Sequence, residues 1–419
     1  MILTAVTRFG DFFNATIAQL MHELGWRPEM IGYGGVGSET EARIIGRALM
    51  SPTPFEERFE AWAKNVGVPT VHDVAELATS VKLPGVNLIA DALGENYQSP
   101  SGDPTSSDSR GERGWRQFID AQIPFQPVLV TLGKARKVLN ADRGGYVDVV
   151  LKNHALEPGW QIATIQALDA RAVERGDKRV RASKPMLVPV RIISTQESHG
   201  IISDVDDTVM ISWLPRPIVA AKNAFFTYVS DRQAVPGMSK FLQFLSHSHA
   251  TKTLADSEQV KKFLPPTVYL STGAWNVAPS LRRFLARGIF PAGIPLMSDW
   301  GPSQTGWFRS GPEHKRKELR RLTQLAPHIK WFLVGDDGQH DPQLYAEFAK
   351  EFPDRVAGIM IRTLTPAELI LSSGKPSALG QLSQVFEGVP DTIPVYVGHD
   401  GFDLARQGRI SGLIKSSYR

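Results

Sequence analysis

Cysteine is absent from this chain of 419 residues. Disulfides and thiolate metal sites are therefore excluded, and any metal must be bound by oxygen atoms or by histidine. The lack of disulfides fits a reducing compartment, so we expect a cytoplasmic protein. The chain also lacks a run of about 18 apolar residues, the length that a membrane-spanning helix needs. Asp11 interrupts the first residues, which carry no basic segment of the kind that begins a signal peptide.

A strong excess of charge of either sign is also missing. Charged residues make up 21% of the chain, and the formal net charge is +4. This mild excess favours anionic substrates or surfaces, but it is too small to indicate a nucleic-acid partner. The hydrophobic content of 42% supports a large core, and the length allows two or three domains.

Residues 1–27 show apolar side chains at helical spacing, which predicts an N-terminal amphipathic helix. Such a helix can pack on its own domain or lie on a membrane surface as a peripheral contact. Its polar face has only Arg8 as a strong cation, which favours packing.

Residues 28–198 alternate short strand-like pieces with turn signals such as Asp142-Arg-Gly-Gly145, which predicts a β-rich sandwich-like domain. The expected strands are 42–49, 118–123, 128–132, 146–151, 161–167 and 186–193. A helical insertion is expected over 55–95, followed by an exposed loop near 97–114 that is rich in Ser, Gly, Pro and Asp.

Residues 199–370 change to an alternation of strands and helices, which predicts an α/β domain with a doubly wound parallel sheet. The expected strands are 200–203, 268–270, 331–334 and 356–361, and the expected helical stretches are 217–228, 238–246, 277–287, 313–325 and 342–351. Residues 371–419 are expected to form a C-terminal extension that packs on this domain, with one more strand at 394–397.

Two carboxylates follow the first of these strands, in the sequence Ile-Ile-Ser-Asp204-Val-Asp206-Asp-Thr208. Burying clustered carboxylates at the end of a strand costs free energy unless a partner relieves their repulsion. Asp oxygens are preferred ligands of Mg²⁺, so the motif predicts a Mg²⁺ site at the carboxyl end of a parallel sheet.

Three further pieces follow in order along the same domain. A strand ends in Ser271-Thr272-Gly273, Lys315 lies near the start of a helix, and another strand ends in Gly-Asp336-Asp337-Gly-Gln-His-Asp341. A carboxylate can attack phosphorus, a second can transfer protons, and a hydroxyl with an ammonium can hold phosphate oxygens. Taken singly, each piece could be a cap, a turn or a strand end, so the prediction of phosphoryl transfer depends on their order and their shared position at strand ends.

Lys315 shares a helix face with Leu319 and Leu322, the inward stripe of apolar residues. A solvated lysine is expected away from that stripe, so Lys315 is the candidate for an inward cation that faces phosphate. The other interpretation is a lysine whose stem covers the surface while its ammonium reaches water.

These pieces together resemble the haloacid dehalogenase superfamily of Mg²⁺-dependent phosphatases. The stretches 202–208, 235–238, 299–301, 314–315 and 335–342 further resemble the catalytic domain of the actin-patch phosphatidate phosphatases, a DUF2183-type family.

The resemblance implies Asp204 as nucleophile and Asp206 as general acid and base, with Thr208 supporting their loop. It implies phosphate binding by Ser271, with Thr272 and Gly273 beside it, and by Lys315. For Mg²⁺ it implies Asp204, the backbone carbonyl of Asp206 and Asp336, with Asp337 or Asp341 assisting. The chain departs from the family at Thr272-Gly273-Ala274 and at Ser298, where substrate is recognised.

The sequence therefore predicts a Mg²⁺-dependent phosphomonoester hydrolase that acts through an aspartyl-phosphate, with phosphatidate or another lipid phosphate as the leading substrate. A phosphatase of soluble metabolites is one alternative. A membrane-binding or partner-binding protein with a vestigial phosphatase domain is the other.

Overall fold

The computed structural model describes residues 27–51, 123–211, 233–254, 260–298, 311–365 and 379–414. These residues form two compact units, one that ends at Ile193 and one that begins at Ser194. The predicted N-terminal helix, the insertion over 55–95, the loop near 97–114, the helical stretch 217–228 and the motif 299–301 lie outside the described residues. The expected strand 118–123 also lies outside them, except for its last residue.

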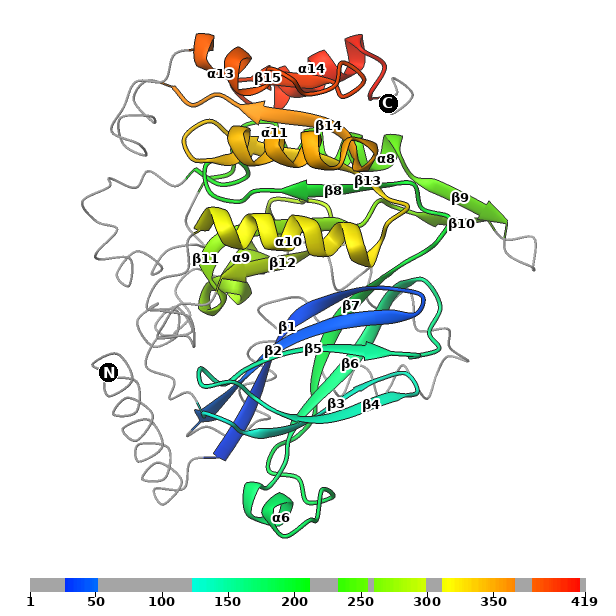
Figure 1. Ribbon diagram of the computed structural model, residues 1–419, viewed down its shortest axis with the longest axis vertical. Coiled ribbons are helices and arrows are strands. Elements are labelled where there is room, and N and C mark those ends of the chain that lie inside the picture. The colour runs from blue at the N-terminus through cyan, green and yellow to red at the C-terminus, as the bar shows by residue number, and fades with distance from the viewer. Residues whose placement is uncertain are drawn as a thin grey trace, which may run out of the picture. The chain divides into compact units, whose positions relative to one another are not determined.

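The first unit is built on a mixed sheet of seven strands in the order β4-β3-β6-β7-β1-β2-β5 (Figure 1). Every neighbouring pair is antiparallel except β1 with β7, which is parallel. The elements are β1 (Arg27–Ser38), β2 (Glu41–Ser51), β3 (Pro127–Leu132), β4 (Ala135–Asn140), β5 (Tyr146–Lys152), β6 (Gly159–Ala167), the short helix α6 (Ala170–Glu174) and β7 (Met186–Ile193).

Five of these strands cover stretches that the sequence predicts, whereas β1 and β4 were not predicted. β1 is rich in glycine because its neighbours lie very close: a Cβ at Gly35 would lie 2.5 Å from the carbonyl oxygen of Arg43. β4 is an edge strand in which no side chain is fully buried, so its sequence shows little alternation of apolar and polar residues. The described strands form one sheet, and the sandwich arrangement stays a prediction.

The second unit contains a six-stranded, wholly parallel sheet in the order β12-β11-β8-β13-β14-β15 (Figure 1). Its strands are β8 (His199–Ser203), β11 (Thr267–Ala274), β12 (Gly293–Ser298), β13 (Lys330–Asp336), β14 (Val356–Arg362) and β15 (Val395–Gly398), and a hairpin of β9 (Thr251–Leu254) and β10 (Val260–Phe263) stands beside it. The α-helices are α8 (Met238–Ser248), α9 (Ala278–Arg287), α10 (Gly311–Leu325), α11 (Asp341–Glu351), α13 (Leu379–Val385) and α14 (Gly401–Ile410).

The strand order determines where a ligand can bind. From β8 the chain adds β11 and β12 on one side, and then returns to add β13, β14 and β15 on the other. A crevice forms at the carboxyl ends of the strands where the order reverses, which here is the edge shared by β8 and β13. The predicted α/β class is confirmed, while the specific haloacid-dehalogenase arrangement stays a prediction. Within the described ranges, no helix has the length and apolarity to cross a bilayer.

Candidate active site

The loop after β8 brings the first acidic motif to the edge shared with β13. Asp204 is 2% exposed, and its backbone N–H donates to the carbonyl oxygen of Val334, 2.8 Å away on the neighbouring strand. Asp207 adopts a left-handed φ of 59°, which turns the chain sharply. Thr208 is fully buried beyond this turn. The turn therefore directs Asp204 into the protein interior and leaves Asp206 half-buried.

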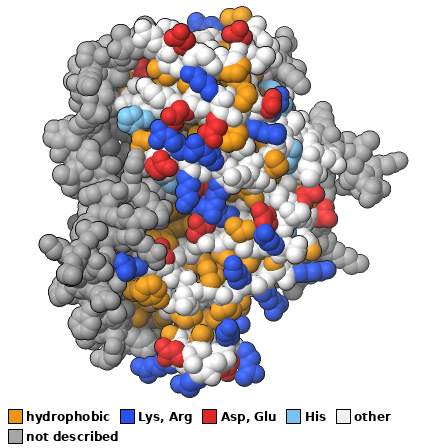
Figure 2. Space-filling view, in the orientation of Figure 1, with side chains coloured by type: hydrophobic (Ala, Val, Ile, Leu, Met, Phe, Trp, Pro, Cys, Tyr) orange, Lys and Arg blue, Asp and Glu red, His pale blue; other side chains and the backbone are white. Residues whose placement is uncertain are grey.

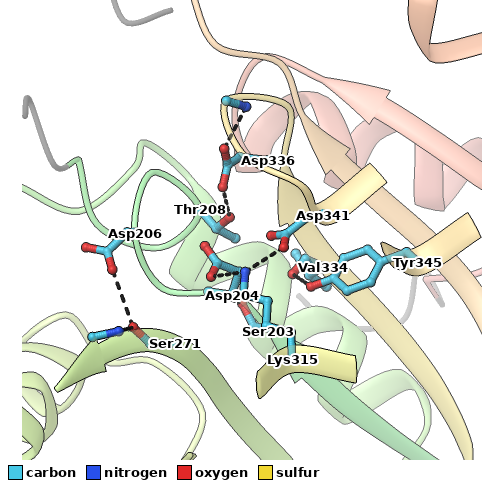
Figure 3. Close-up of polar contacts among 12 residues, drawn as sticks. Ser203, Asp204, Asp206, Thr208, Ser271, Lys315, Val334, Asp336, Asp341 and Tyr345 are labelled. Atoms are coloured by element: carbon cyan, nitrogen blue, oxygen red, sulfur yellow. Dashed lines mark hydrogen bonds and ion pairs between the residues drawn. The ribbon is translucent and has the colours of Figure 1, made fainter. Parts of the chain in front are cut away.

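Lys315 lies between two carboxylates in the interior (Figure 3). Its Nζ is 2.6 Å from Oδ1 of Asp204 and 2.5 Å from Oδ1 of Asp341. The side chain is 2% exposed and lies on the same buried face of α10 as Leu319 and Leu322. Its stem therefore does not cover the surface, and its ammonium does not reach water.

Three buried carboxylates converge around this ammonium. Asp204, Asp336 and Asp341 each contribute an oxygen to a group in which all the oxygens lie within 4.8 Å of one another. Asp336 accepts hydrogen bonds from Thr208 Oγ1 at 3.2 Å and from the Gly338 N–H at 2.8 Å. Within the part of the chain that the structure describes, Oδ2 of Asp204 and Oδ2 of Asp341 are buried without a hydrogen-bond partner. Unpartnered oxygens at a cluster of three acids fit a divalent cation.

The electrostatics of the cluster lead to the same conclusion. Burial raises the pKa of Asp204 to about 7, with a further rise from Asp341 and Asp206 that Lys315 opposes. Burial and the charges of Asp204 and Asp341 also raise the pKa of Asp336 well above its usual value. Burial alone would lower the pKa of Lys315, but its two carboxylate partners outweigh burial and raise it, so the ammonium stays charged. One ammonium thus faces three carboxyl groups, and the raised pKa values favour protons on these acids when no cation is bound; a divalent cation would replace those protons and stabilise the carboxylates.

Asp206 points toward the second predicted motif rather than into the carboxylate cluster (Figure 3). Ser271 Oγ donates to Asp206 Oδ2 at 3.4 Å and accepts from the Gly273 N–H at 2.9 Å. Thr272 is half-buried, and its carbonyl oxygen accepts from Ser298 Oγ at 2.6 Å. The structure therefore brings the 271–273 strand end to the acidic loop, on the side that Asp206 occupies.

Asp337 lies outside the cluster, although it is adjacent in sequence to Asp336. Its Oδ1 accepts from the Leu364 N–H at 2.8 Å, and its own N–H donates to the Arg362 carbonyl oxygen at 3.0 Å. Of the two acids that were candidates to complete the metal shell, Asp341 is the one that joins the carboxylate cluster.

Sequence reasoning missed Arg362, the last residue of β14. This arginine is 4% exposed, and its Nη1 donates to the carbonyl oxygen of Asp207 at 2.7 Å. Its Nε donates to the His399 carbonyl oxygen at 3.1 Å. Arg362 therefore ties the left-handed turn of the acidic loop to the end of the sheet. The available signal was a cation as the last residue of an apolar strand, where a buried charge needs a specific partner.

Gly335 allows the close approach of the last two acidic groups, and replacing it should be costly. A Cβ at this position would lie 2.6 Å from Asp341 Oδ2 and 2.8 Å from Tyr345 Cε2. We expect Gly335→Ala to lower the free energy of unfolding by about 1–3 kcal/mol, because overpacking forces neighbours to shift. The measurement is urea denaturation. Gly358→Ala on β14 is the matched control, since its Cβ meets nothing closer than 3.4 Å; equal losses in both variants would contradict this account.

Residues 199–363 match a family model described as the catalytic domain of phosphatidate phosphatase APP1. The matched segment is therefore similar to the catalytic domain of a phosphatase. The predicted family resemblance is thereby confirmed over these residues, which include the whole carboxylate cluster and Lys315.

Two relatives are similar to this part of the chain. An uncharacterized protein of Schizosaccharomyces pombe is 27% identical over 165 residues, which are 39% of this chain and 25% of that protein. Phosphatidate phosphatase APP1 of Saccharomyces cerevisiae is 22% identical over 188 residues, which are 45% of this chain and 30% of that protein. The matches thus span less than a third of the length of each relative. Among solved structures, a carbohydrate acetylesterase from Xanthomonas citri gives a TM-score of only 0.23 at 12% identity, covering 69% of each chain.

Proposed function

We propose that this chain is a Mg²⁺-dependent phosphomonoester hydrolase that works through an aspartyl-phosphate. The observation that carries the proposal is the buried group of Asp204, Asp336 and Asp341 around the Lys315 ammonium, with two unpartnered carboxylate oxygens. A structural ion pair requires neither a third carboxylate nor buried oxygens without partners. A site that receives phosphate and a cation accounts for both features.

In the first step, a carboxylate oxygen of Asp204 attacks phosphorus, and the bond from phosphorus to the ester oxygen breaks. Lys315 holds Oδ1 of Asp204 at 2.6 Å, so the carboxylate is fixed in orientation while Oδ2 stays without a partner. Asp206 donates a proton to the departing ester oxygen, which leaves as an alcohol. The product on the protein is an acyl phosphate at Asp204.

In the second step, water attacks phosphorus and the bond to the Asp204 oxygen breaks. Asp206, now a carboxylate, takes the proton from this water, which restores both acids and releases inorganic phosphate. Ser271 lies beside Asp206 and donates to it, which supports a role for its hydroxyl in binding a phosphate oxygen near the proposed proton-transfer group. Lys315 supplies positive charge to the phosphoryl group during both steps.

Asp204, Asp336 and Asp341 would hold Mg²⁺, and Thr208 and Gly338 orient Asp336 for this role. The bound cation would neutralise charge on the phosphoryl oxygens and on the acids themselves. Asp337 would act on the surrounding loop, because its carboxylate accepts from the Leu364 N–H.

A lipid phosphate is the substrate class that we propose. The yeast relative carries the name phosphatidate phosphatase, and the family model has the same description. A phosphatidate headgroup is a phosphomonoester, the group that the two-step chemistry cleaves. Thr272 and Ser298 border the Ser271 side of the site and are proposed to contact the remainder of the substrate.

The test is release of inorganic phosphate from phosphatidate in detergent micelles and from p-nitrophenyl phosphate, with Mg²⁺ and with a chelator. We expect turnover only with Mg²⁺ and faster turnover of phosphatidate. Equal or faster hydrolysis of the soluble ester would favour a soluble-metabolite phosphatase, and no hydrolysis of either would contradict a phosphatase.

Two neighbouring acids provide the matched variants for the metal. Asp341→Asn is expected to raise the Mg²⁺ concentration for half-maximal turnover more than about tenfold, because loss of an outer-shell partner alone costs ~10–100-fold in metal affinity. Asp337→Asn should leave that concentration close to the wild-type value. A larger effect of Asp337→Asn would overturn the proposed ligand set.

A further inference from the structure

A loop rich in Arg and Lys connects β6 and β7 of the first unit. We call residues 168–184 the α6 loop. It is closed at its base, where the Asp169 N–H donates to the Val180 carbonyl oxygen at 3.0 Å and the Ala182 N–H donates to the Ala167 carbonyl oxygen at 2.9 Å. Asp169 also caps α6 by accepting from the Ala172 N–H at 2.7 Å. The α6 loop is therefore held in a defined conformation by its own hydrogen bonds.

The α6 loop gathers positive charge. It contains three acids, Asp169, Glu174 and Asp177, and six exposed cations: Arg171, Arg175, Lys178, Arg179, Arg181 and Lys184. Figure 2 shows Lys and Arg side chains around this end of the unit, where Figure 1 places α6. Asp177 forms an ion pair with Arg179 within the loop, at 3.0 Å. That pair is exposed, and exposed pairs contribute little, so the excess of cations defines the surface.

Apolar side chains are exposed at the same end. Phe125 is 50% exposed and Val180 is 43% exposed. Phe125 stays beside the α6 loop because the next residue, Gln126, donates from Nε2 to the Leu168 carbonyl oxygen at 2.7 Å. The Leu168 N–H also donates to the Pro127 carbonyl oxygen at 2.8 Å. In the first unit, the described residues include one other exposed large apolar side chain, that of Ile162, so two of the three lie at this end.

We propose that Phe125 and the α6 loop form a docking surface for an anionic membrane. Cations around exposed apolar side chains match the interface between acidic headgroups and acyl chains, where both kinds of side chain are favoured. A single-stranded nucleic acid would be bound through several stacking aromatics along a basic groove, whereas Phe125 is the one aromatic side chain that these observations place here. This surface lies in the first unit and does not depend on the proposed phosphatase activity.

The experiment is co-sedimentation of the full chain with vesicles of phosphatidylcholine, with and without phosphatidylglycerol. Wild-type protein should sediment with the anionic vesicles and stay in solution with the neutral ones. The triple variant Arg175→Gln, Lys178→Gln and Arg181→Gln should bind about 100-fold more weakly at low salt, since each cation near an anionic surface contributes about a fivefold factor. Phe125→Asn, which keeps the left-handed φ of 56° accessible, should weaken the binding that persists at high salt.

The matched control removes the same charge elsewhere: Arg287→Gln, Lys317→Gln and Lys350→Gln are exposed and lie on three different helices of the second unit. This control should bind vesicles like wild type. Both triple variants should keep wild-type turnover of p-nitrophenyl phosphate, which separates failure of docking from failure of catalysis. Equal binding by the two triple variants, no binding of wild type to anionic vesicles, or preferential binding of single-stranded RNA over anionic vesicles would each overturn the proposal.

Discussion

Asp204→Asn is expected to lower phosphate release by about 10⁴-fold or more, because an amide cannot replace the attacking carboxylate. The proposed nucleophile Asp204 is held in place: it is 2% exposed, one of its oxygens is bound by Lys315 at 2.6 Å, and the other has no hydrogen-bond partner among the described residues. Asn has nearly the same shape, so the substitution removes charge and nucleophilicity with little change in volume. The measurement is turnover of phosphatidate micelles at saturating Mg²⁺.

Loss of turnover must be separated from loss of the fold, and the pH dependence of stability does this. Burial raises the pKa of Asp204 from 3.8 to about 7. A carboxyl group with a raised pKa stabilises the fold at pH values below its unfolded pKa, and this contribution is lost as the pH rises through the folded value. Asp204→Asn cannot ionise. The metal-free variant should therefore lose less stability than metal-free wild type between about pH 5 and pH 8, as measured by urea midpoints.

Two substitutions in the acidic loop separate the two proposed roles of its carboxylates, attack on phosphorus and proton transfer. Asp206→Asn should retain slow formation of the acyl phosphate while slowing its hydrolysis, because Asp206 lies beside Ser271 and outside the carboxylate cluster. Asp204→Asn should form no acyl phosphate at all. Unchanged turnover in Asp204→Asn, with the fold intact, would exclude the aspartyl-phosphate mechanism.

The parts of the site that could be predicted from sequence are those with local signals. Asp204 follows a short apolar strand, so its position at a strand end could be predicted. Lys315 shares a 3.6-residue period with Leu319 and Leu322, so its burial could be predicted. Which of Asp337 and Asp341 joins the carboxylate cluster could not be predicted, because it depends on the direction in which a short turn points each side chain. Arg362 was missed for a similar reason: its partner, the Asp207 carbonyl oxygen, is 155 residues away in sequence.

The fold shows the same division between local and tertiary signals. Strands with apolar alternation, such as β5 and β6, were predicted, because half-buried strands repeat every two residues. β1 was missed since its glycines are selected by the close approach of β2 and β7, a tertiary constraint that weakens the strand signal. β12 carries Pro295 inside it and forms one edge of the parallel sheet, where a missing donor is tolerated. The alternation of strands with helices along the chain predicts a parallel sheet, whereas the order of the strands in that sheet follows from packing.

Lys315→Met is expected to lower the free energy of unfolding of the metal-free protein by about 3–5 kcal/mol, because removing one partner leaves buried charge uncompensated. Met fills a similar volume, so the effect comes from charge. Asp204, Asp336 and Asp341 would then face one another without the ammonium that now binds two of them. Turnover should fall by about 10²–10³-fold, the usual cost of losing a donor that stabilises charge in the transition state.

Lys317→Met is the matched control, because Lys317 lies two residues further along α10 and is exposed. It should change stability by no more than about 0.5 kcal/mol and leave turnover unchanged. The destabilisation by Lys315→Met should also shrink from about pH 8 to pH 5, since the unpaired carboxyl groups can then bind protons in place of the lost cation. A cost that is independent of pH would mean that Lys315 acts through packing. A cost equal to that of Lys317→Met would mean that its ammonium contributes nothing to the site.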